Sequence, residues 1–176
     1  MTKRKAALST REMVVFAMLG VIVFLSKLLM EWAPNIHLVG MLIMVYTLVY
    51  RKKALIPLYL YVILLGVYYG FATWWVPYLY IWTILWGVTM LLPKNMPRKH
   101  AIPIYMAVCG LHGLCYGILY APAQALFFGL NFKGMITWII AGFPFDALHA
   151  VGNLAAGVLI VPLTELLQKL EKGISK

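Results

Sequence analysis

The residues from Leu38 to Gly70 read LVGMLIMVYTLVYRKKALIPLYLYVILLGVYYG. Three adjacent cations, Arg51, Lys52 and Lys53, interrupt a stretch that is otherwise almost wholly apolar. The apolar side chains follow one another without the alternation of a barrel strand, so each flank predicts a helix in apolar surroundings. A cationic break between two such helices is typical of a short loop at a membrane surface. The stretch therefore predicts two membrane helices joined by a basic turn.

The composition extends this prediction to the whole chain. Of the 176 residues, 64% are hydrophobic and 11% are charged, whereas about 25% of the residues in a soluble domain are charged. A soluble globule of this size cannot hide so much apolar surface from water. A soluble enzyme and a disordered tail are both excluded. The two cysteines, Cys109 and Cys115, are too few for a disulfide framework and lack metal-ligand spacing. We expect an all-α integral membrane protein without a metal site or a cofactor.

Apolar runs near the roughly 20 residues that a transmembrane helix needs occur six times along the chain. Their approximate bounds are 12–32, 35–50, 54–70, 76–92, 102–119 and 137–163. We expect one domain, residues 1–176, that forms a single bundle of six transmembrane helices.

Basic side chains gather at every second boundary between these runs. The four groups hold 13 of the 15 lysines and arginines: Lys3, Arg4, Lys5 and Arg11; Arg51, Lys52 and Lys53; Lys94, Arg98 and Lys99; Lys169, Lys172 and Lys176. The positive-inside rule places these boundaries and both termini in the cytoplasm. The connections 33–37, 71–75 and 120–134 are then external. The net charge of +10 is thus explained by orientation in a plasma membrane, so we expect no nucleic acid partner.

The sixth run carries the most concentrated polar group. Asp146, His149 and Asn153 stand at positions i, i+3 and i+7, which places them on one helical face. Pro144, just before them, is predicted to lie near the helix start, where a missing amide proton costs little. Polar groups inside a bilayer are expensive and commonly functional, so this face predicts contacts with a ligand. The alternative is that the three residues only join helices together.

Aromatic residues cluster around the outer end of the fourth run. Trp75, Trp82 and Trp86 lie roughly on one face, where they can stack on an aromatic or heterocyclic ligand. An interfacial aromatic belt is the alternative. His37, in the first outer connection, and Gln124, just beyond the fifth run, are predicted to face the same external cavity as Asp146.

The sequence lacks several catalytic motifs. It has no P-loop, so nucleotide hydrolysis by this chain is not expected. It has neither a G-x-S-x-G nucleophile elbow nor an H-E-x-x-H zinc motif. Asp146 and His149 could serve an acid–base reaction, but no nucleophile shares their face. Around His112, Gly113 and Gly117 have the spacing of closely packed membrane helices.

In layout, the chain resembles the substrate-binding S components of energy-coupling factor (ECF) transporters. The resemblance in sequence lies in the last run, where the residues from Phe143 to Asn153 read FPFDALHAVGN and are followed by Pro162-Leu163. It implies a high-affinity subunit that is not itself an enzyme. Such a subunit binds a vitamin on the outer side, between the first loop and the last three helices. It then associates with a transmembrane coupling (T) subunit and two cytoplasmic ATPases, and topples in the membrane to release the vitamin inside.

In this family, small residues of an A-x-x-x-A pattern on the first helix contact the coupling subunit. The matching region here reads Ala17-Met18-Leu19-Gly20-Val21, with valine in place of the second alanine. The resemblance therefore implies a docking surface of Ala17, Gly20 and Val21.

The ligands consistent with the polar residues are a cobalamin, a queuosine precursor, a pyrimidine or pyridoxine-type compound, and pantothenate. Asp146, His149 and Asn153 would hydrogen-bond to the ligand. Two other classes remain as alternatives. One is an intramembrane enzyme that uses Asp146 and His149, and the other is a stand-alone, ion-coupled small carrier.

Overall fold

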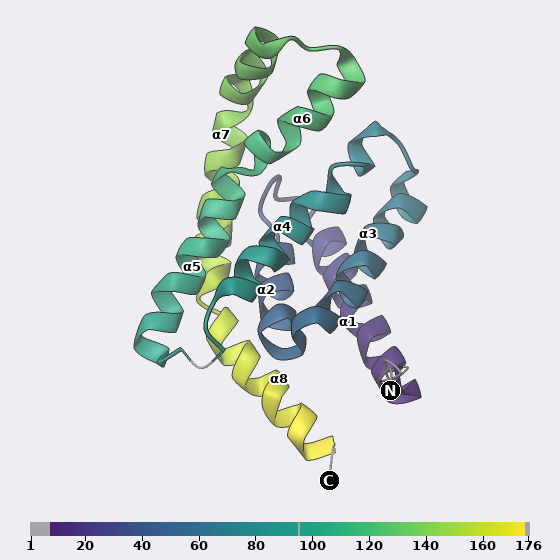
Figure 1. Ribbon diagram of the computed structural model, residues 1–176, viewed down its shortest axis with the longest axis vertical. Helices are drawn as coiled ribbons and strands as arrows, with labels where there is room; N and C mark the ends of the chain where they lie inside the picture. The colour runs from purple at the N-terminus through teal and green to yellow at the C-terminus, as the bar shows by residue number, and fades with distance from the viewer. Residues whose placement is uncertain (1–7, 95, 175–176) are drawn as a thin grey trace, which may run out of the picture.

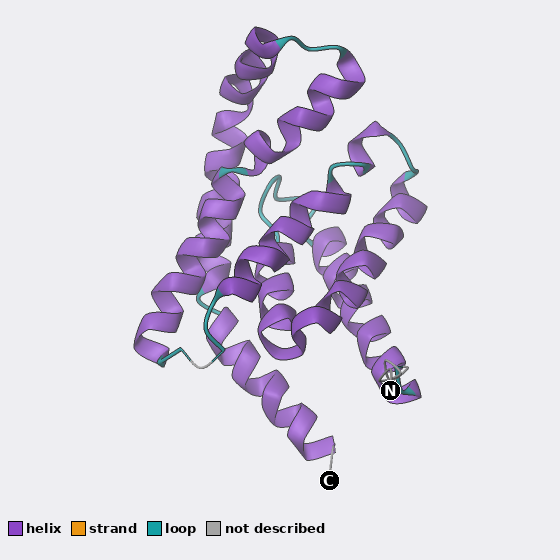
Figure 2. Ribbon diagram, in the orientation of Figure 1, coloured by secondary structure: helices purple, strands orange, loops and turns teal. Residues whose placement is uncertain are grey.

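The structure is a computed structural model that describes residues 8–94 and 96–174. All regular elements in these residues are helical (Figure 2). In chain order they are α1 Thr10–Leu29, α2 Val39–Tyr50, the 3-10 helix η1 Arg51–Ala54, α3 Leu55–Tyr69, the 3-10 helix η2 Thr73–Trp75, α4 Tyr78–Leu91, α5 Arg98–Leu114, α6 Tyr116–Phe128, α7 Phe132–Gly157 and α8 Ile160–Ile174. The predicted all-α class is confirmed.

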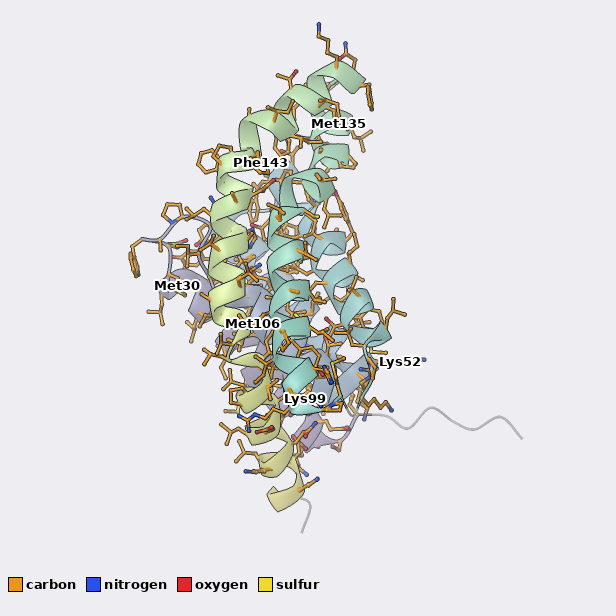
Figure 3. The ribbon with its side chains drawn as sticks, turned by 90° about the vertical axis from the view of Figure 1, so that its left-hand side faces the viewer. Met30, Lys52, Lys99, Met106, Met135 and Phe143 are labelled. Carbon is orange, nitrogen blue, oxygen red and sulfur yellow. The ribbon has the colours of Figure 1, made fainter. Side chains whose placement is uncertain are left out.

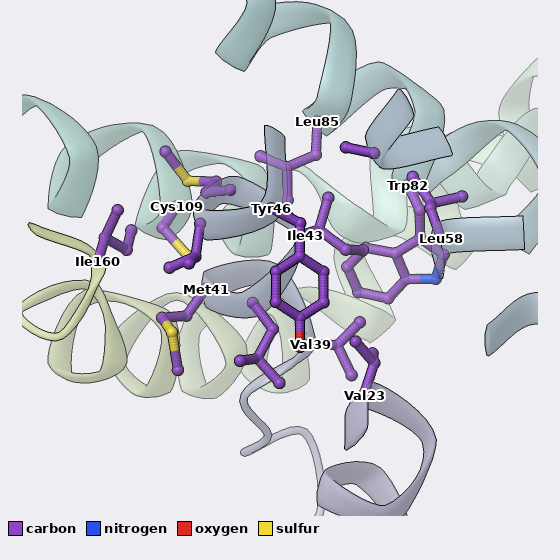
Figure 4. Close-up of a cluster of buried hydrophobic side chains, with 14 of the residues drawn as sticks. Val23, Val39, Met41, Ile43, Tyr46, Leu58, Trp82, Leu85, Cys109 and Ile160 are labelled. Carbon is purple, nitrogen blue, oxygen red and sulfur yellow. The ribbon is translucent and has the colours of Figure 1, made fainter. Parts of the chain in front are cut away.

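The short helix α2 forms the centre of the molecule (Figure 1). Every residue from Val39 to Leu48 is buried, because α1, α4, α5, α7 and α8 all pack against this helix. Figure 4 shows the resulting core, to which α2 contributes Met41, Ile43 and Tyr46 and α4 contributes Trp82 and Leu85. A helix that is apolar all round is one that is buried all round. The apolar run in the opening stretch is therefore explained by protein neighbours on every side.

A second feature of the fold is the close pairing of α5 with α7, which run side by side (Figure 1). A Cβ on Gly113 would lie 3.0 Å from the carbonyl carbon of His149. A Cβ on Gly117 would lie 2.3 Å from Oδ2 of Asp146. Both distances are shorter than normal van der Waals contact, so only glycine allows this approach. The predicted close packing at Gly113 and Gly117 is confirmed.

Three helical stretches are long and apolar enough to span a membrane: 10–29, 98–128 and 132–157. By contrast, α2, α3 and α4 have 12, 15 and 14 residues. At 1.5 Å per residue these helices are about 18 to 23 Å long, less than the roughly 30 Å hydrocarbon core of a bilayer. The structure therefore supports an all-α protein with three candidate spans in the described residues, a coarser statement than the predicted bundle of six.

The predicted outer connection 120–134 is wrong in its extent. After a break at Cys115, α6 carries the helix on to Phe128, and α7 already begins at Phe132. Gly129 ends α6 in the left-handed conformation with φ +64°, and the Asn131 side chain caps α7 by accepting from the amide of Gly134 at 2.8 Å. Pro122 lies inside α6, and a proline is tolerated inside a helix of this kind.

The predicted last span, 137–163, also differs from the structure, which divides it between α7 and α8 at residues 158 and 159. Pro144 consequently lies in the interior of α7 instead of near its start. Figure 3 shows the axis of α7 changing direction near Phe143. A proline removes one hydrogen bond from the helix and its ring crowds the preceding turn, which explains the bend.

The described basic groups lie at one end of the molecule, which we call the charged end. The start of α1 and the end of α8 lie on this side (Figure 1), and Lys52 and Lys99 lie on it together (Figure 3). Three ion pairs join its segments. Arg11 Nη2 bonds to Glu171 Oε2 at 3.0 Å, Arg98 Nη1 lies 3.5 Å from Glu165 Oε2, and Lys53 bonds to Glu12.

Candidate functional site

The polar residues of α7 lie on one buried face, as their spacing predicts. Asp146, His149 and Asn153 are 7%, 3% and 0% exposed. This face is turned toward α5 and α6, because Asp146 bonds to Gly117 and Asn153 bonds to Cys109. The three side chains nevertheless have different partners.

Asp146 is engaged by the backbone of α6. Its Oδ1 and Oδ2 atoms accept from the amide of Gly117 at 3.1 and 3.0 Å. Helix α6 begins at Tyr116, so this amide belongs to a first turn whose N–H groups lack intrahelical partners. A carboxylate at this position also complements the positive end of the helix dipole. Asp146 thus supplies from α7 the cap that α6 needs after the break at Cys115.

Only one end of the Asn153 side-chain amide is hydrogen-bonded. Its Nδ2 atom donates to the backbone carbonyl of Cys109 at 3.1 Å, which leaves Oδ1 as the free end of the amide. Oδ1 is buried and has no hydrogen-bond partner. Asn153 therefore offers a hydrogen-bond acceptor whose direction is set by the bond on its other side.

His149 belongs to a group of five rings that we call the ring cluster: His37, Trp82, His112, Tyr116 and His149. The ring of His149 lies 4.7 Å from that of His37 and 5.0 Å from that of Tyr116, between centroids. The ring of Trp82 contacts two members of the cluster, with its centroid 5.9 Å from those of both His37 and Tyr116. His112 lies 5.4 Å from Trp82. The cluster draws one residue each from the connection after α1 and from α4, α5, α6 and α7.

The ring cluster lies away from the charged end. His37 follows the end of α1 that is opposite its basic start, and Trp82 lies in the first half of α4, which ends near Lys94. His112 is close to the last residue of α5, a helix that begins at Arg98. The cluster and the charged end therefore occupy opposite ends of the same helices.

Polar atoms without partners are concentrated in and beside the ring cluster. Each of the following atoms is buried without a hydrogen-bond partner among the described residues: His37 Nδ1, Tyr61 Oη, Trp82 Nε1, His112 Nδ1, His149 Nε2 and Asn153 Oδ1. Such an atom costs about 1–3 kcal/mol when it is left unpaired, and native structures contain few of them. Their concentration around contacting rings makes the ring cluster the candidate site.

Of the predicted tryptophan stripe, only Trp82 joins the ring cluster. It is 1% exposed. Trp75 and Trp86 are half-buried and bond to backbone carbonyls through Nε1, Trp75 to Val62 at 2.7 Å and Trp86 to Arg51 at 3.1 Å. These two indoles hold neighbouring segments together. The expectation that all three line one stacking surface is not met, because the N–H groups of Trp75 and Trp86 each bond to a carbonyl in a different segment, outside the ring cluster.

The remaining predicted site residues fall into two groups. His37 is in the ring cluster, where its ring contacts that of His149. Gln124 lies on α6, seven residues beyond Gly117, and is half-buried. It is part of a helix and not of the loop in which it was expected.

Three residues in or near the ring cluster were not predicted as site residues from the sequence. Tyr116 and Tyr61 stood among eleven tyrosines, and neither has a spacing that marks it. His112 stood out only through the glycines beside it, which indicated packing. Its signal was a histidine in the middle of an apolar helix, since such a residue needs a partner that its own helix does not supply.

The three residues of the expected docking surface do not share a face. Ala17 and Val21 are exposed on α1, together with Met18, which is 61% exposed. Gly20 is buried against α3, where an added Cβ would lie 2.8 Å from Cδ2 of Leu60. Gly20 therefore serves the contact between α1 and α3, and the exposed part of the expected surface consists of Ala17 and Val21.

Within residues 8–94 and 96–174, no group of three or more histidine, cysteine, aspartate or glutamate side chains has the arrangement of a metal site. Fold and site together define a helical protein with candidate membrane spans and a buried cluster of contacting rings with unpartnered polar atoms. Comparisons with protein families, with curated proteins and with solved structures find no match to this chain.

Proposed function

We propose that this chain is the substrate-binding S component of an ECF-type transporter that imports a water-soluble vitamin or heterocyclic precursor. In this proposal the chain crosses the plasma membrane of a prokaryote six times, with its charged end in the cytoplasm and the ring cluster toward the outside. A T subunit and two ATPases drive release. The observation that carries the proposal is the ring cluster with its unpartnered polar atoms.

The position of the ring cluster supports a binding role on the outer side. Its residues come from the first connection and from four later helices, which matches the first loop and last helices expected from the resemblance. The connection that carries His37 also packs on α7, since a Cβ on Gly152 would lie 3.3 Å from Ile36. Movement of this connection would open the cluster to a ligand.

The contacts of Asp146 favour binding over the enzymatic alternative. A general acid or base must be free to exchange a proton with the substrate. Both oxygens of Asp146 instead accept from the Gly117 amide. In the proposal, Asp146 holds α6 in place and thereby positions Tyr116, while His149, Asn153, Trp82 and His37 contact the ligand.

The outer face of α1 offers a surface for the T subunit. The side chains of Val14, Met18, Val21, Ile22 and Leu25 are exposed and apolar, and they recur at helical spacing. Ala17 lies among them. Such a stripe can pack against another membrane helix, with the small residue allowing close approach.

Co-expression with the T subunit and the two ATPases of an ECF module tests the proposal. The tagged chain should retain all three subunits in fixed proportion through purification in detergent. Val21→Trp, on the proposed docking face, should abolish this retention. Val67→Trp is the matched control, because Val67 is exposed on α3, away from that face. Failure of the wild-type chain to retain the subunits, together with an absence of any bound small molecule by mass spectrometry, would contradict the proposal.

A further inference from the structure

The protein atoms of the ring cluster specify the ligand more closely than the proposed function does. Three of the unpartnered atoms have a fixed hydrogen-bonding role. The indole Nε1–H of Trp82 can only donate, and Oδ1 of Asn153 can only accept. The third atom is on His112, whose Nε2 faces the carbonyl oxygen of Ile81 at 3.1 Å.

A carbonyl oxygen is an acceptor, so Nε2 of His112 carries the proton and donates. In a neutral imidazole the other nitrogen then accepts, and Nδ1 of His112 is the unpartnered atom. The site therefore presents one fixed donor and two fixed acceptors. His37 Nδ1, His149 Nε2 and the Tyr61 hydroxyl can adapt to either role.

The charged side chains near the cluster either have a hydrogen-bond partner already or lie at its edge. The carboxylate of Asp146 is held by the Gly117 amide. Lys27, half-buried near the end of α1, acts electrostatically on His37. The remaining polar atoms are those of uncharged groups, and burying a charged ligand among them without a countercharge is expensive.

We infer that the ring cluster binds a planar, uncharged heterocycle of the amide or lactam type, which presents at least two N–H donors and one acceptor. This inference rests on the proposed binding role and narrows it. The rings of His37, Tyr116 and Trp82 supply faces and edges for a flat molecule. Wrong ligands are rejected because they leave Trp82 or Asn153 unpaired. Pyrimidine-type compounds and lactam precursors fit this description, whereas pantothenate, an acyclic carboxylate, does not.

Two matched pairs of probes test the inference on the detergent-solubilised full chain. Nicotinamide and nicotinate share a ring and differ in amide against carboxylate; uracil and orotate differ by one added carboxylate. Thermal unfolding and quenching of tryptophan fluorescence report binding. The neutral member of at least one pair should bind about tenfold or more tightly than its charged mate, because of the desolvation cost of the carboxylate.

A preference for the charged probes would be recognised by its dependence on Lys27. A carboxylate that reaches Lys27 would make nicotinate or orotate the tighter member, and Lys27→Gln would remove that preference. Such a result overturns the inference, as does the lack of binding by both neutral probes. Trp82→Phe, which removes the fixed donor but keeps a ring, should weaken the neutral probe about tenfold. Tyr80→Phe is the control, because the Tyr80 hydroxyl bonds to the carbonyl of Leu119 outside the cluster.

This inference and the proposed function fail in different ways. Retention of the T subunit and ATPases together with a charged co-purifying compound would refute the neutral-heterocycle inference alone. Preference for the neutral probes without any retention of those subunits would refute the transport role alone.

Discussion

The ring cluster and the charged end differ in how their polar groups are paired. At the charged end, Arg11, Lys53 and Arg98 each have an acidic partner, and the Tyr50 hydroxyl donates to Glu171 at 2.8 Å. These side chains are substantially exposed. In the ring cluster the side chains carry no fixed charge, and several buried polar atoms have no partner.

The difference shows which polar groups are available to a ligand. The charged end also has a cleft of about 460 Å³, lined by Arg11, Glu12, Lys53 and Glu171 among others. Its charges neutralise one another, so a ligand there would have to displace existing ion pairs. In the ring cluster a ligand would instead supply bonds that are missing, which makes the cluster the better candidate.

The largest expected effect concerns the packing that builds the ring cluster. Gly113→Val should destabilise the fold by about 3 kcal/mol, because its Cβ would meet the backbone of His149, which cannot move aside without shifting α7. The measurement is the midpoint of thermal unfolding in detergent. Gly87→Val is the matched control, since Gly87 on α4 has nothing within 4 Å of an added Cβ. Equal midpoints for the two variants would show that the helices can separate at no cost.

The second effect tests whether Asp146 behaves like the paired groups of the charged end. Asp146→Ala should cost about 2 kcal/mol of stability, because α6 loses a charged cap at its first turn. Thermal unfolding without any ligand is the measurement. An unchanged midpoint, accompanied by loss of ligand binding, would mean that Asp146 contacts the ligand, as its position on the polar face of α7 predicts.

The third prediction compares a paired and an unpaired tyrosine hydroxyl. Tyr80→Phe should cost about 1 kcal/mol, because it removes a bond of 2.8 Å to the Leu119 carbonyl. Tyr61→Phe should leave stability unchanged or raise it, because the Tyr61 hydroxyl is buried without a partner. Only Tyr61→Phe should weaken binding of a neutral heterocycle, measured by fluorescence. The reverse pattern would mean that Tyr61 is a structural residue like Tyr80.

The smallest expected effect belongs to the charged end itself. Arg98→Ala should change stability by about 0.5 kcal/mol or less, because Arg98 and Glu165 form an exposed pair and water screens them. High salt should reduce even this difference. Thermal midpoints at low and high salt measure it. A loss of several kcal/mol would show that this end contributes to stability as strongly as the buried helix contacts.

Much of the architecture was predictable because it depends on local patterns. Continuous apolar runs predicted helices, and the i, i+3, i+7 spacing placed Asp146, His149 and Asn153 on one face. Glycine spacing around His112 predicted close helix packing. Helix ends were less predictable: the fifth run was expected to end near residue 119, whereas α6 continues through Pro122 to Phe128.

The sequence by itself determined that the chain is helical and apolar, and that its basic residues gather between alternate apolar runs. These properties follow from the composition and periodicity of neighbouring residues. Only the tertiary structure decided which polar atoms are satisfied. Asp146 bonds to an amide 29 residues away, Asn153 to a carbonyl 44 residues away, and the ring of His37 contacts that of His149, 112 residues further along the chain. Hydrogen bonds act over about 3 Å, so a side chain becomes a cap or a free ligand contact only when the packed helices have chosen its neighbours.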